Sequence, residues 1–183
     1  MSVLSASGAS ATTQAGSYTA ALLELLGDRD PLDVLRTTPA AISVVVSGLV
    51  PSQIETPERP GKWSIRDVVQ HLGDAEMVVG VRLRMVLAQD RPPLIGYDQD
   101  VWVERLRYRD VPLADALEQF TVIRRVNLRL WAGLTHADLD RAGVHNERGE
   151  ETLGFMRNIH AGHDLAHLRQ LSRISGAVSG AAP

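Results

Sequence analysis

The chain has 183 residues, 44% hydrophobic and 22% charged, a balance typical of a soluble globular protein with its own core. Its net charge is −3 and no basic stripe appears, so nucleic acid is not expected as a partner. No apolar run reaches the roughly 18 residues of a membrane span, and the N-terminus lacks the basic and apolar pattern of a secretory signal. We therefore expect no membrane association and, by default, a cytoplasmic location.

The sequence contains no cysteine. Disulfides, thiolate metal ligands and a cysteine nucleophile are thereby excluded. A metal site would have to use nitrogen and oxygen ligands, which favours Zn, Ni, Fe or Mn over iron–sulfur clusters.

The N-terminal region predicts a tail followed by short helices. Residues 1–16 are rich in Ser, Ala, Thr and Gly and are expected to be a disordered tail. A helix is predicted over residues 18–26. The pair Asp30-Pro31 predicts an N-cap followed by proline at the first helical position. Because Pro39 repeats this signal within a helical apolar pattern, residues 31–49 are predicted to form one kinked helix or two pieces.

The middle of the chain predicts a long helix. Residues 51–62 contain three prolines and a glycine and are expected to be a loop. Ser64 then has the character of an N-cap, and Asp67 that of its capping-box partner. The apolar stripe that follows extends to about residue 89.

The second half predicts three further helices, over residues 98–107, from Pro112 to about Gly133, and over 152–175 with Thr152 as the cap. Residues 136–151 are expected to be a loop, and no strand is predicted. The buried stripe of the helix after Pro112 is predicted to be Leu113, Leu117, Phe120, Ile123, Val126, Leu130 and Leu134. Together these elements predict an all-α helical bundle over residues 17–176, with a frayed tail at 177–183.

Two histidines in the last predicted helix have the spacing of metal ligands. His163 and His167 are four residues apart, so both side chains lie on one helix face. Two imidazoles at this spacing can bind one metal ion. A third ligand must come from another element, and His71 in the long middle helix is the best candidate.

Two segments resemble a known family. Residues 63–76, which begin Trp-Ser-Ile-Arg-Asp and contain His-Leu-Gly-Asp-Ala-Glu, resemble the tryptophan-then-HLxDxE segment of the DinB/YfiT-like metalloprotein superfamily. Residues 163–171, His-Asp-Leu-Ala-His-Leu-Arg-Gln-Leu, resemble its HDxxHxxQ segment. The resemblance extends from about residue 30 to residue 174.

The resemblance implies a four-helix bundle of up-down-down-up type, often a homodimer, with a divalent metal held by His71, His163 and His167. The superfamily includes thiol S-transferases that use bacillithiol or mycothiol and a mycothiol-dependent maleylpyruvate isomerase. It therefore implies a metal-dependent enzyme acting on a small-molecule substrate, and the expected reaction is thiol S-transfer or thiol-assisted isomerisation with a low-molecular-weight thiol as cofactor. The nucleophile would be a metal-bound thiol or water. A metal-dependent hydrolase, a non-catalytic metal-binding stress-response dimer and a helical protein without metal are the alternatives.

Other residues near these motifs are assigned supporting roles. His160 lies one turn before His163 and is expected to line the cavity or support a ligand rather than bind metal. Asp74 is expected either to accept the second N–H of His71 or to be an ordinary surface acid. Glu76 is expected to point away from His71.

The remaining candidates are weaker. Asp164 and Gln170 flank the histidine pair and are possible supports for it, and Trp63 is expected to pack under the start of its helix rather than stack on a substrate. His136 and His145 are expected to be exposed in loops. Five arginines have the charge to bind an anionic substrate but are expected to be solvated: Arg82, Arg84, Arg105, Arg107 and Arg109.

Overall fold

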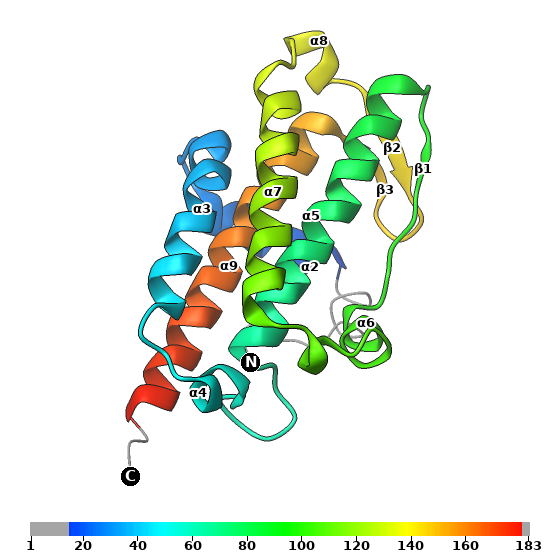
Figure 1. Ribbon diagram of the computed structural model, residues 1–183. Helices are drawn as coiled ribbons and strands as arrows, with labels where there is room; N and C mark the ends of the chain where they lie inside the picture. The colour runs from blue at the N-terminus through cyan, green and yellow to red at the C-terminus, as the bar shows by residue number, and fades with distance from the viewer. Residues whose placement is uncertain (1–14, 181–183) are drawn as a thin grey trace.

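The four longest helices lie side by side in the computed structural model, which describes residues 15–180 (Figure 1). They are α3 (Pro31–Val46), α5 (Ile65–Ala88), α7 (Leu113–Ala132) and α9 (Leu153–Gly180). α3 and α9 run in one direction and α5 and α7 in the other, which is the up-down-down-up order (Figure 1). α5 and α7 are parallel neighbours, so the connection from the end of α5 to the start of α7, residues 89–112, runs back along the length of the bundle. The prediction of an all-α four-helix bundle is confirmed.

Shorter elements surround the bundle. They are α2 (Ala15–Leu26), α4 (Pro51–Glu55), β1 (Pro93–Leu94), α6 (Gln99–Arg105), η2 (Tyr108–Asp110), α8 (His136–Leu139), β2 (Ala142–His145) and β3 (Gly149–Thr152). β2 pairs with β1 in parallel and with β3 antiparallel. The prediction that residues 136–151 form a loop without strands is wrong, because strands of two to four residues are too short to show an alternating pattern.

Two of the predicted boundaries are also wrong. α2 begins at Ala15, so the end of the expected tail is helical, and residues 1–14 lie outside the described residues. α9 passes through Gly176 and ends at Gly180. The last turns are held because Val178 is buried and its carbonyl accepts a hydrogen bond of 3.4 Å from Gln53 Nε2. Residues 181–183 lie outside the described residues.

The predicted helix caps are confirmed. Asp30 accepts two backbone N–H bonds at the start of α3. Ser64 and Asp67 form a reciprocal capping box at the start of α5, with Ser64 N donating to Asp67 Oδ2 at 2.9 Å. Thr152 Oγ1 accepts from Phe155 N at 3.1 Å. Each such cap stabilises its helix by about 1 kcal/mol and fixes where the helix begins.

α3 is a single helix that contains Pro39. Proline has no N–H, so the carbonyl four residues earlier, that of Leu35, has no helical donor. Arg124 from α7 donates through Nη1 to this oxygen at 2.8 Å. The side chain of a neighbouring helix thus satisfies the carbonyl that the proline leaves unpaired.

The core consists of two apolar clusters separated by a polar layer. One cluster centres on Leu35, Leu83, Trp131, Leu153 and Met156. The other centres on Ile42, Leu72, Phe120, Leu171 and Ile174. Between them along the helices lie four buried polar side chains: Glu76, Arg124, His160 and Asp164. The candidate site described below borders this layer.

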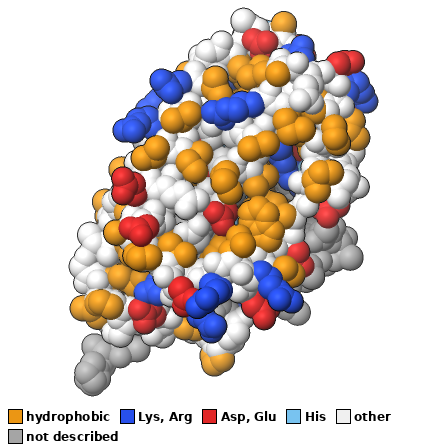
Figure 2. All heavy atoms as spheres, turned by 45° about the vertical axis from the view of Figure 1, so that its right-hand side comes forward, with side chains coloured by type: hydrophobic (Ala, Val, Ile, Leu, Met, Phe, Trp, Pro, Cys, Tyr) orange, Lys and Arg blue, Asp and Glu red, His pale blue; other side chains and the backbone are white. Residues whose placement is uncertain are grey.

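Within the described residues, no helix combines the length and the apolarity that a bilayer crossing needs. Figure 2 turns the right-hand side of Figure 1 toward the viewer, and on this face basic and acidic side chains are interspersed.

Candidate metal centre

Three imidazoles converge between α5 and α9. His71 lies in the second turn of α5, and His163 and His167 lie on successive turns of α9. His163 Nε2 is 3.1 Å from His71 Nε2 and 3.1 Å from His167 Nε2. The ring centroids of the three pairs are 4.3–5.2 Å apart. The structure therefore brings together the three residues that the sequence motifs singled out.

The protonation of His167 leaves the lone pair of its Nε2 toward the common centre. His167 Nδ1 lies 2.8 Å from Gln170 Oε1, which can only accept, so the proton sits on Nδ1 and the lone pair on Nε2. Burial, and then the neighbouring imidazoles, hold the pKa of His71 and of His163 well below the usual range. Burial also lowers the pKa of His167. The imidazoles are therefore neutral near pH 7, which is the form that binds metal.

The donor set fits a divalent metal ion. Nitrogen ligands 2.0–2.1 Å from one ion are about 3.3–3.4 Å apart in a tetrahedral site and about 2.9 Å apart in an octahedral one. The separations of 3.1 Å lie between these values. Neutral imidazole nitrogens facing one another this closely repel unless a proton or a cation lies among them. The buried Nδ1 atoms of His71 and His163 have no hydrogen-bond partner among the described residues, so only the contacts among their Nε2 atoms orient these two rings.

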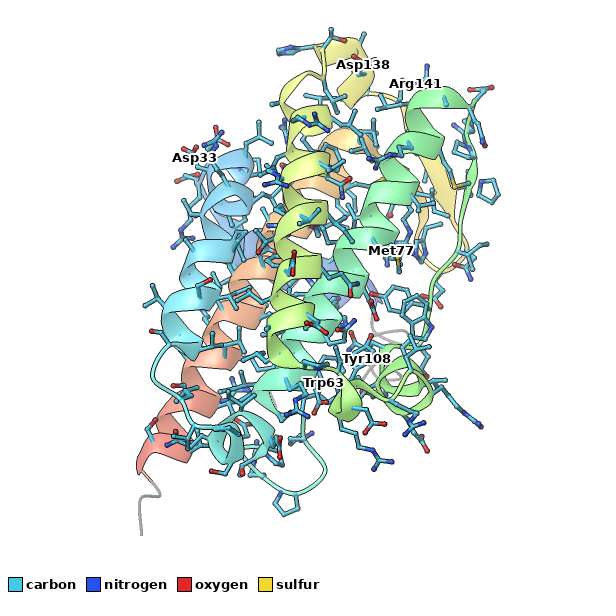
Figure 3. The ribbon with its side chains drawn as sticks, in the orientation of Figure 1. Asp33, Trp63, Met77, Tyr108, Asp138 and Arg141 are labelled. Carbon is cyan, nitrogen blue, oxygen red and sulfur yellow. The ribbon has the colours of Figure 1, made fainter. Side chains whose placement is uncertain are left out.

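Trp63 forms a wall of the histidine cluster. Its ring is stacked on His167 with centroids 6.3 Å apart and planes at 7°, and it lies 5.0 Å from the ring of His71. Figure 3 places Trp63 at the end of the bundle where α5 begins. The expected packing under the helix start is present, and the tryptophan ring also contacts two of the three imidazoles.

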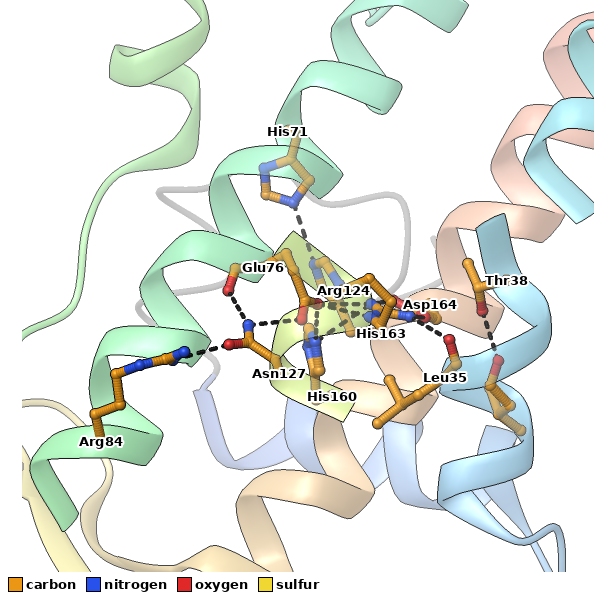
Figure 4. A network of polar contacts seen from close by, with 11 residues as sticks. Leu35, Thr38, His71, Glu76, Arg84, Arg124, Asn127, His160, His163 and Asp164 are labelled. Carbon is orange, nitrogen blue, oxygen red and sulfur yellow. Dashed lines mark hydrogen bonds and ion pairs between the residues drawn. The ribbon is translucent and has the colours of Figure 1, made fainter. Parts of the chain in front are cut away.

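The polar layer beside the histidines is organised by Arg124 (Figure 4). Its guanidinium contacts Glu76 at 2.8 Å and binds both oxygens of Asp164 at 2.6 and 3.0 Å. With the bond to Leu35, this one side chain connects all four bundle helices. Glu76 also accepts from Asn127 Nδ2 at 2.8 Å. Burial acts to raise the pKa of Glu76, but His160 and Arg124 outweigh it and lower this pKa to about 2.

His160 belongs to this layer. Its Nε2 lies 2.7 Å from Glu76 Oε2 and 3.3 Å from Arg124 Nη2. The ionised carboxylate can only accept, so the shorter contact indicates that Nε2 donates to Glu76. Arg124 can only donate, so its longer contact with the protonated Nε2 is not a hydrogen bond. His160, His163 and Asp164 also form a cluster with metal-ligand spacing. However, Asp164 is bound by Arg124 and His160 by Glu76, so the cluster of His71, His163 and His167 is the better metal site.

Both alternatives predicted for Asp74 are wrong, because its carboxylate does not bond His71 and is buried rather than at the surface. Asp74 instead accepts from Tyr108 Oη at 2.6 Å, from Gln119 Nε2 at 3.0 Å and from Gln70 Nε2 at 3.1 Å. Tyr108 lies near the start of α7 (Figure 3). Asp74 thus fixes the chain before α7 to α5. The support for a ligand comes from Gln170, which was the weaker candidate.

A cavity of about 160 Å³ borders the histidine cluster. Its wall includes His71 and His163 from the cluster and His160 from the polar layer. The other main contributors are Tyr18 and Leu22 of α2, Val78 and Arg82 of α5, Tyr97 from the connection, and His145, Glu147 and Arg148 from the hairpin. Two of the three imidazoles, those of His71 and His163, therefore border a space that can hold a small molecule.

The prediction that His145 is exposed is wrong, whereas His136 is exposed as expected. His145 is buried in β2, with its Nδ1 accepting from Glu147 N at 3.2 Å. Burial, with Arg148 and Arg82 adding to it, lowers the pKa of His145 to about 4. It is therefore a neutral group of the cavity wall at pH 7.

α2 reaches its place in the cavity wall through a glycine in α9. A Cβ at Gly162 would lie 2.2 Å from the carbonyl oxygen of Leu22, so only glycine permits this approach. We expect Gly162→Ala to displace α2 and to lower the free energy of unfolding by about 1–3 kcal/mol. Gly176→Ala is the matched control in the same helix, because a Cβ there meets nothing within 4 Å. This control should stabilise by up to about 1 kcal/mol, and equal effects of the two in urea unfolding would contradict the expectation.

Comparison with known proteins was made by family, sequence and structure. The family model of the DinB superfamily matches residues 34–171. "Putative metal-dependent hydrolase YfiT" of Bacillus subtilis (strain 168) is 28% identical over 153 residues, covering 79% of this chain and 84% of that protein. A relative from Oceanobacillus iheyensis with the same description is 26% identical over 143 residues, covering 78% and 83%. The solved structure of YfiT from Bacillus subtilis, described as having an unusual four-helix bundle topology, superimposes with a TM-score of 0.75 at 25% identity, covering 80% and 84%.

Proposed function

The chain belongs to the DinB superfamily, and from this premise we propose that it is a metal-dependent enzyme whose divalent metal is held by His71, His163 and His167. The observation that carries the proposal is the convergence of three neutral Nε2 atoms beside a cavity. The description of both relatives as metal-dependent hydrolases supports hydrolysis as the reaction.

A divalent ion at this position would supply Lewis acidity and lower the pKa of a bound water or thiol. The chain's own residues orient a ligand, exclude water and enclose the substrate. Gln170 holds the proton of His167 on Nδ1 and so keeps Nε2 available. Trp63 covers one side of the imidazoles and excludes water there. α2 and the β2–β3 hairpin enclose the substrate on the open side.

Thiol S-transfer is the alternative reaction at the same site. Since the chain has no cysteine, the thiol would have to be a low-molecular-weight cofactor such as bacillithiol or mycothiol. Hydrolysis needs no such cofactor. The two reactions are therefore separated by whether turnover depends on an added thiol.

The test uses protein stripped of metal and then loaded in turn with Zn, Ni, Fe or Mn. Each form is assayed on a panel of esters and amides, and with thiols plus an electrophile such as chlorodinitrobenzene. We expect turnover that requires metal and that falls to background in His71→Ala. If every loaded form matched the His71→Ala variant while metal removal sharply lowered the melting temperature, the metal would be structural and the proposal of an enzyme would fail.

A further inference from the structure

Arg82 is a partly buried cation in the wall of the cavity, and none of the described residues places a carboxylate within ion-pair distance of it. Its Nη2 donates to the carbonyl oxygen of Ile95 at 2.5 Å and lies 3.5 Å from His145 Nε2. Burial has the largest effect on the pKa of Arg82 and lowers it, and Arg148 lowers it further. Tyr97, Glu151 and Glu147 act in the opposite direction but do not reverse the shift. The net shift disfavours the cation, so a further negative charge in contact with it would be stabilising.

The other two guanidinium groups of this region are already paired. Arg148 binds Glu151, with Nη2 2.9 Å from Oε2, and Arg124 binds two carboxylates in the polar layer. A guanidinium has five N–H donors in a fork that matches a carboxylate. Among the described residues of the cavity wall, Arg82 is thus the cation without a contacting carboxylate, so its charge and its remaining donors are available to a ligand.

The groups around Arg82 favour one negative charge rather than two. Burial raises the pKa of Tyr18 to about 12 and also raises that of Tyr97, so both phenols keep their protons and can donate. His145 is neutral, as described above. The exposed carboxylate of Glu147 lines the same cavity and repels an additional negative charge. This balance suits a carboxylate better than a phosphate dianion.

Arg82 and His71 lie on the same face of α5. They are eleven residues apart, which places their Cα atoms about 16.5 Å apart and within about 20° around the helix. Between them the wall is apolar, with Ala75, Val78 and Val79 from the same helix. The cavity therefore has a cationic position, an apolar middle and an end at the histidine cluster.

We infer that Arg82 binds the carboxylate of the substrate, and that the substrate is an elongated small-molecule carboxylate whose apolar middle lies along α5. Its reacting group then lies at the histidine end, which rests on the proposed function. Carboxylate binding at Arg82 does not depend on metal. Arg82 is thereby assigned the role of binding a carboxylate, whereas the sequence alone suggests that it is solvated.

The test measures equilibrium binding of 4-phenylbutyrate and of its neutral analogue 4-phenylbutanamide by calorimetry or NMR titration. Wild-type protein is used in metal-free and zinc-loaded forms. We expect the carboxylate to bind at least about tenfold more tightly than the amide in both forms, and Arg82→Gln to remove the preference. Arg125→Gln, which removes an equal charge from the exposed face of α7, should leave it unchanged.

Two further variants keep the test decisive if Arg82→Gln does not fold. Arg82→Lys keeps the charge but loses the planar fork, so its preference should be intermediate. Glu147→Gln removes the exposed carboxylate and should strengthen carboxylate binding. The absence of any preference in wild type, or a preference unchanged in Arg82→Lys and Glu147→Gln, would overturn the inference.

Metal dependence separates the inference from the proposed function. A preference that needs zinc, disappears in His163→Ala and survives Arg82→Gln would locate the carboxylate at the metal. That result would overturn the inference while supporting the metal site. A preference in metal-free protein that Arg82→Gln removes would support the inference even if no turnover were found.

Discussion

Arg124→Met is expected to lower the free energy of unfolding by about 3–5 kcal/mol, because it leaves the buried carboxylates of Glu76 and Asp164 without their cation. It also removes the donor to the Leu35 carbonyl, which Pro39 deprives of a helical partner. Methionine fills similar space, so most of the loss comes from charge and hydrogen bonding rather than from a cavity. Urea unfolding measures the change.

Arg125→Met provides the matched control, since Arg125 is the next residue in α7 and is exposed. Its effect should stay within about 0.5 kcal/mol. Adding Glu76→Gln and Asp164→Asn to Arg124→Met should recover part of the stability, because no buried charge then remains without a partner. A loss below about 1 kcal/mol in Arg124→Met would mean that the four-helix junction is not held by this ion-pair network.

His163→Ala is expected to weaken metal binding by more than about 100-fold, because His163 Nε2 is the atom nearest to both other imidazole nitrogens. Gln170→Ala should weaken it by about 10–100-fold, the usual effect of losing a group that orients a ligand. Competition with a chelator of known affinity measures both. His136→Ala, which removes an exposed histidine, should leave the affinity unchanged.

Tryptophan fluorescence gives an independent reading of the same site. Trp63 contacts two of the three imidazoles, so nickel bound among them should quench its emission. Trp63→Phe should abolish the nickel-dependent change while leaving stoichiometric metal binding intact. The three-histidine assignment is contradicted if His163→Ala retains one tightly bound metal per chain, or if His136→Ala loses it.

The features that the sequence predicted well depend on neighbours within about one helical turn. The caps at Asp30, Ser64 and Thr152 and the facing of His163 and His167 are all of this kind. His71 was harder, since it is 92 residues from His163. It was the best third candidate from its place in the long middle helix, but most of the support for joining the two segments came from the family resemblance.

The buried face of α7 was predicted only in part. Of the predicted stripe, Phe120 is fully buried, and four leucines pack partly buried against the core: Leu113, Leu117, Leu130 and Leu134. The residues that face the core are Ala116, Phe120, Arg124, Asn127 and Trp131. Their spacing is helical. The prediction missed this set because it assumed that arginine is exposed, whereas Arg124 is buried. The sequence did contain one signal, because Arg124 has the helical spacing of Phe120 and Trp131. Its partners Glu76 and Asp164 lie on other helices and could be identified only from the structure.

The cavity wall was unpredictable for a different reason. His145 is buried because a short strand lies against β1 and beside Arg82, contacts that join segments about 50–60 residues apart. Nothing in the local sequence of β2 specifies these partners. The same holds for Arg82, whose surroundings come from the connection and the hairpin rather than from its own helix.

Because α5 and α7 are parallel, the candidate metal ligands and much of the outer cavity wall come from different segments of the chain. The three candidate ligands come from bundle helices, whereas much of the outer cavity wall comes from the return connection and from the β2–β3 hairpin. Side chains in these two segments can change without moving a histidine. Substitutions in these two segments can therefore alter which molecules fit the cavity while the three candidate ligands stay in place.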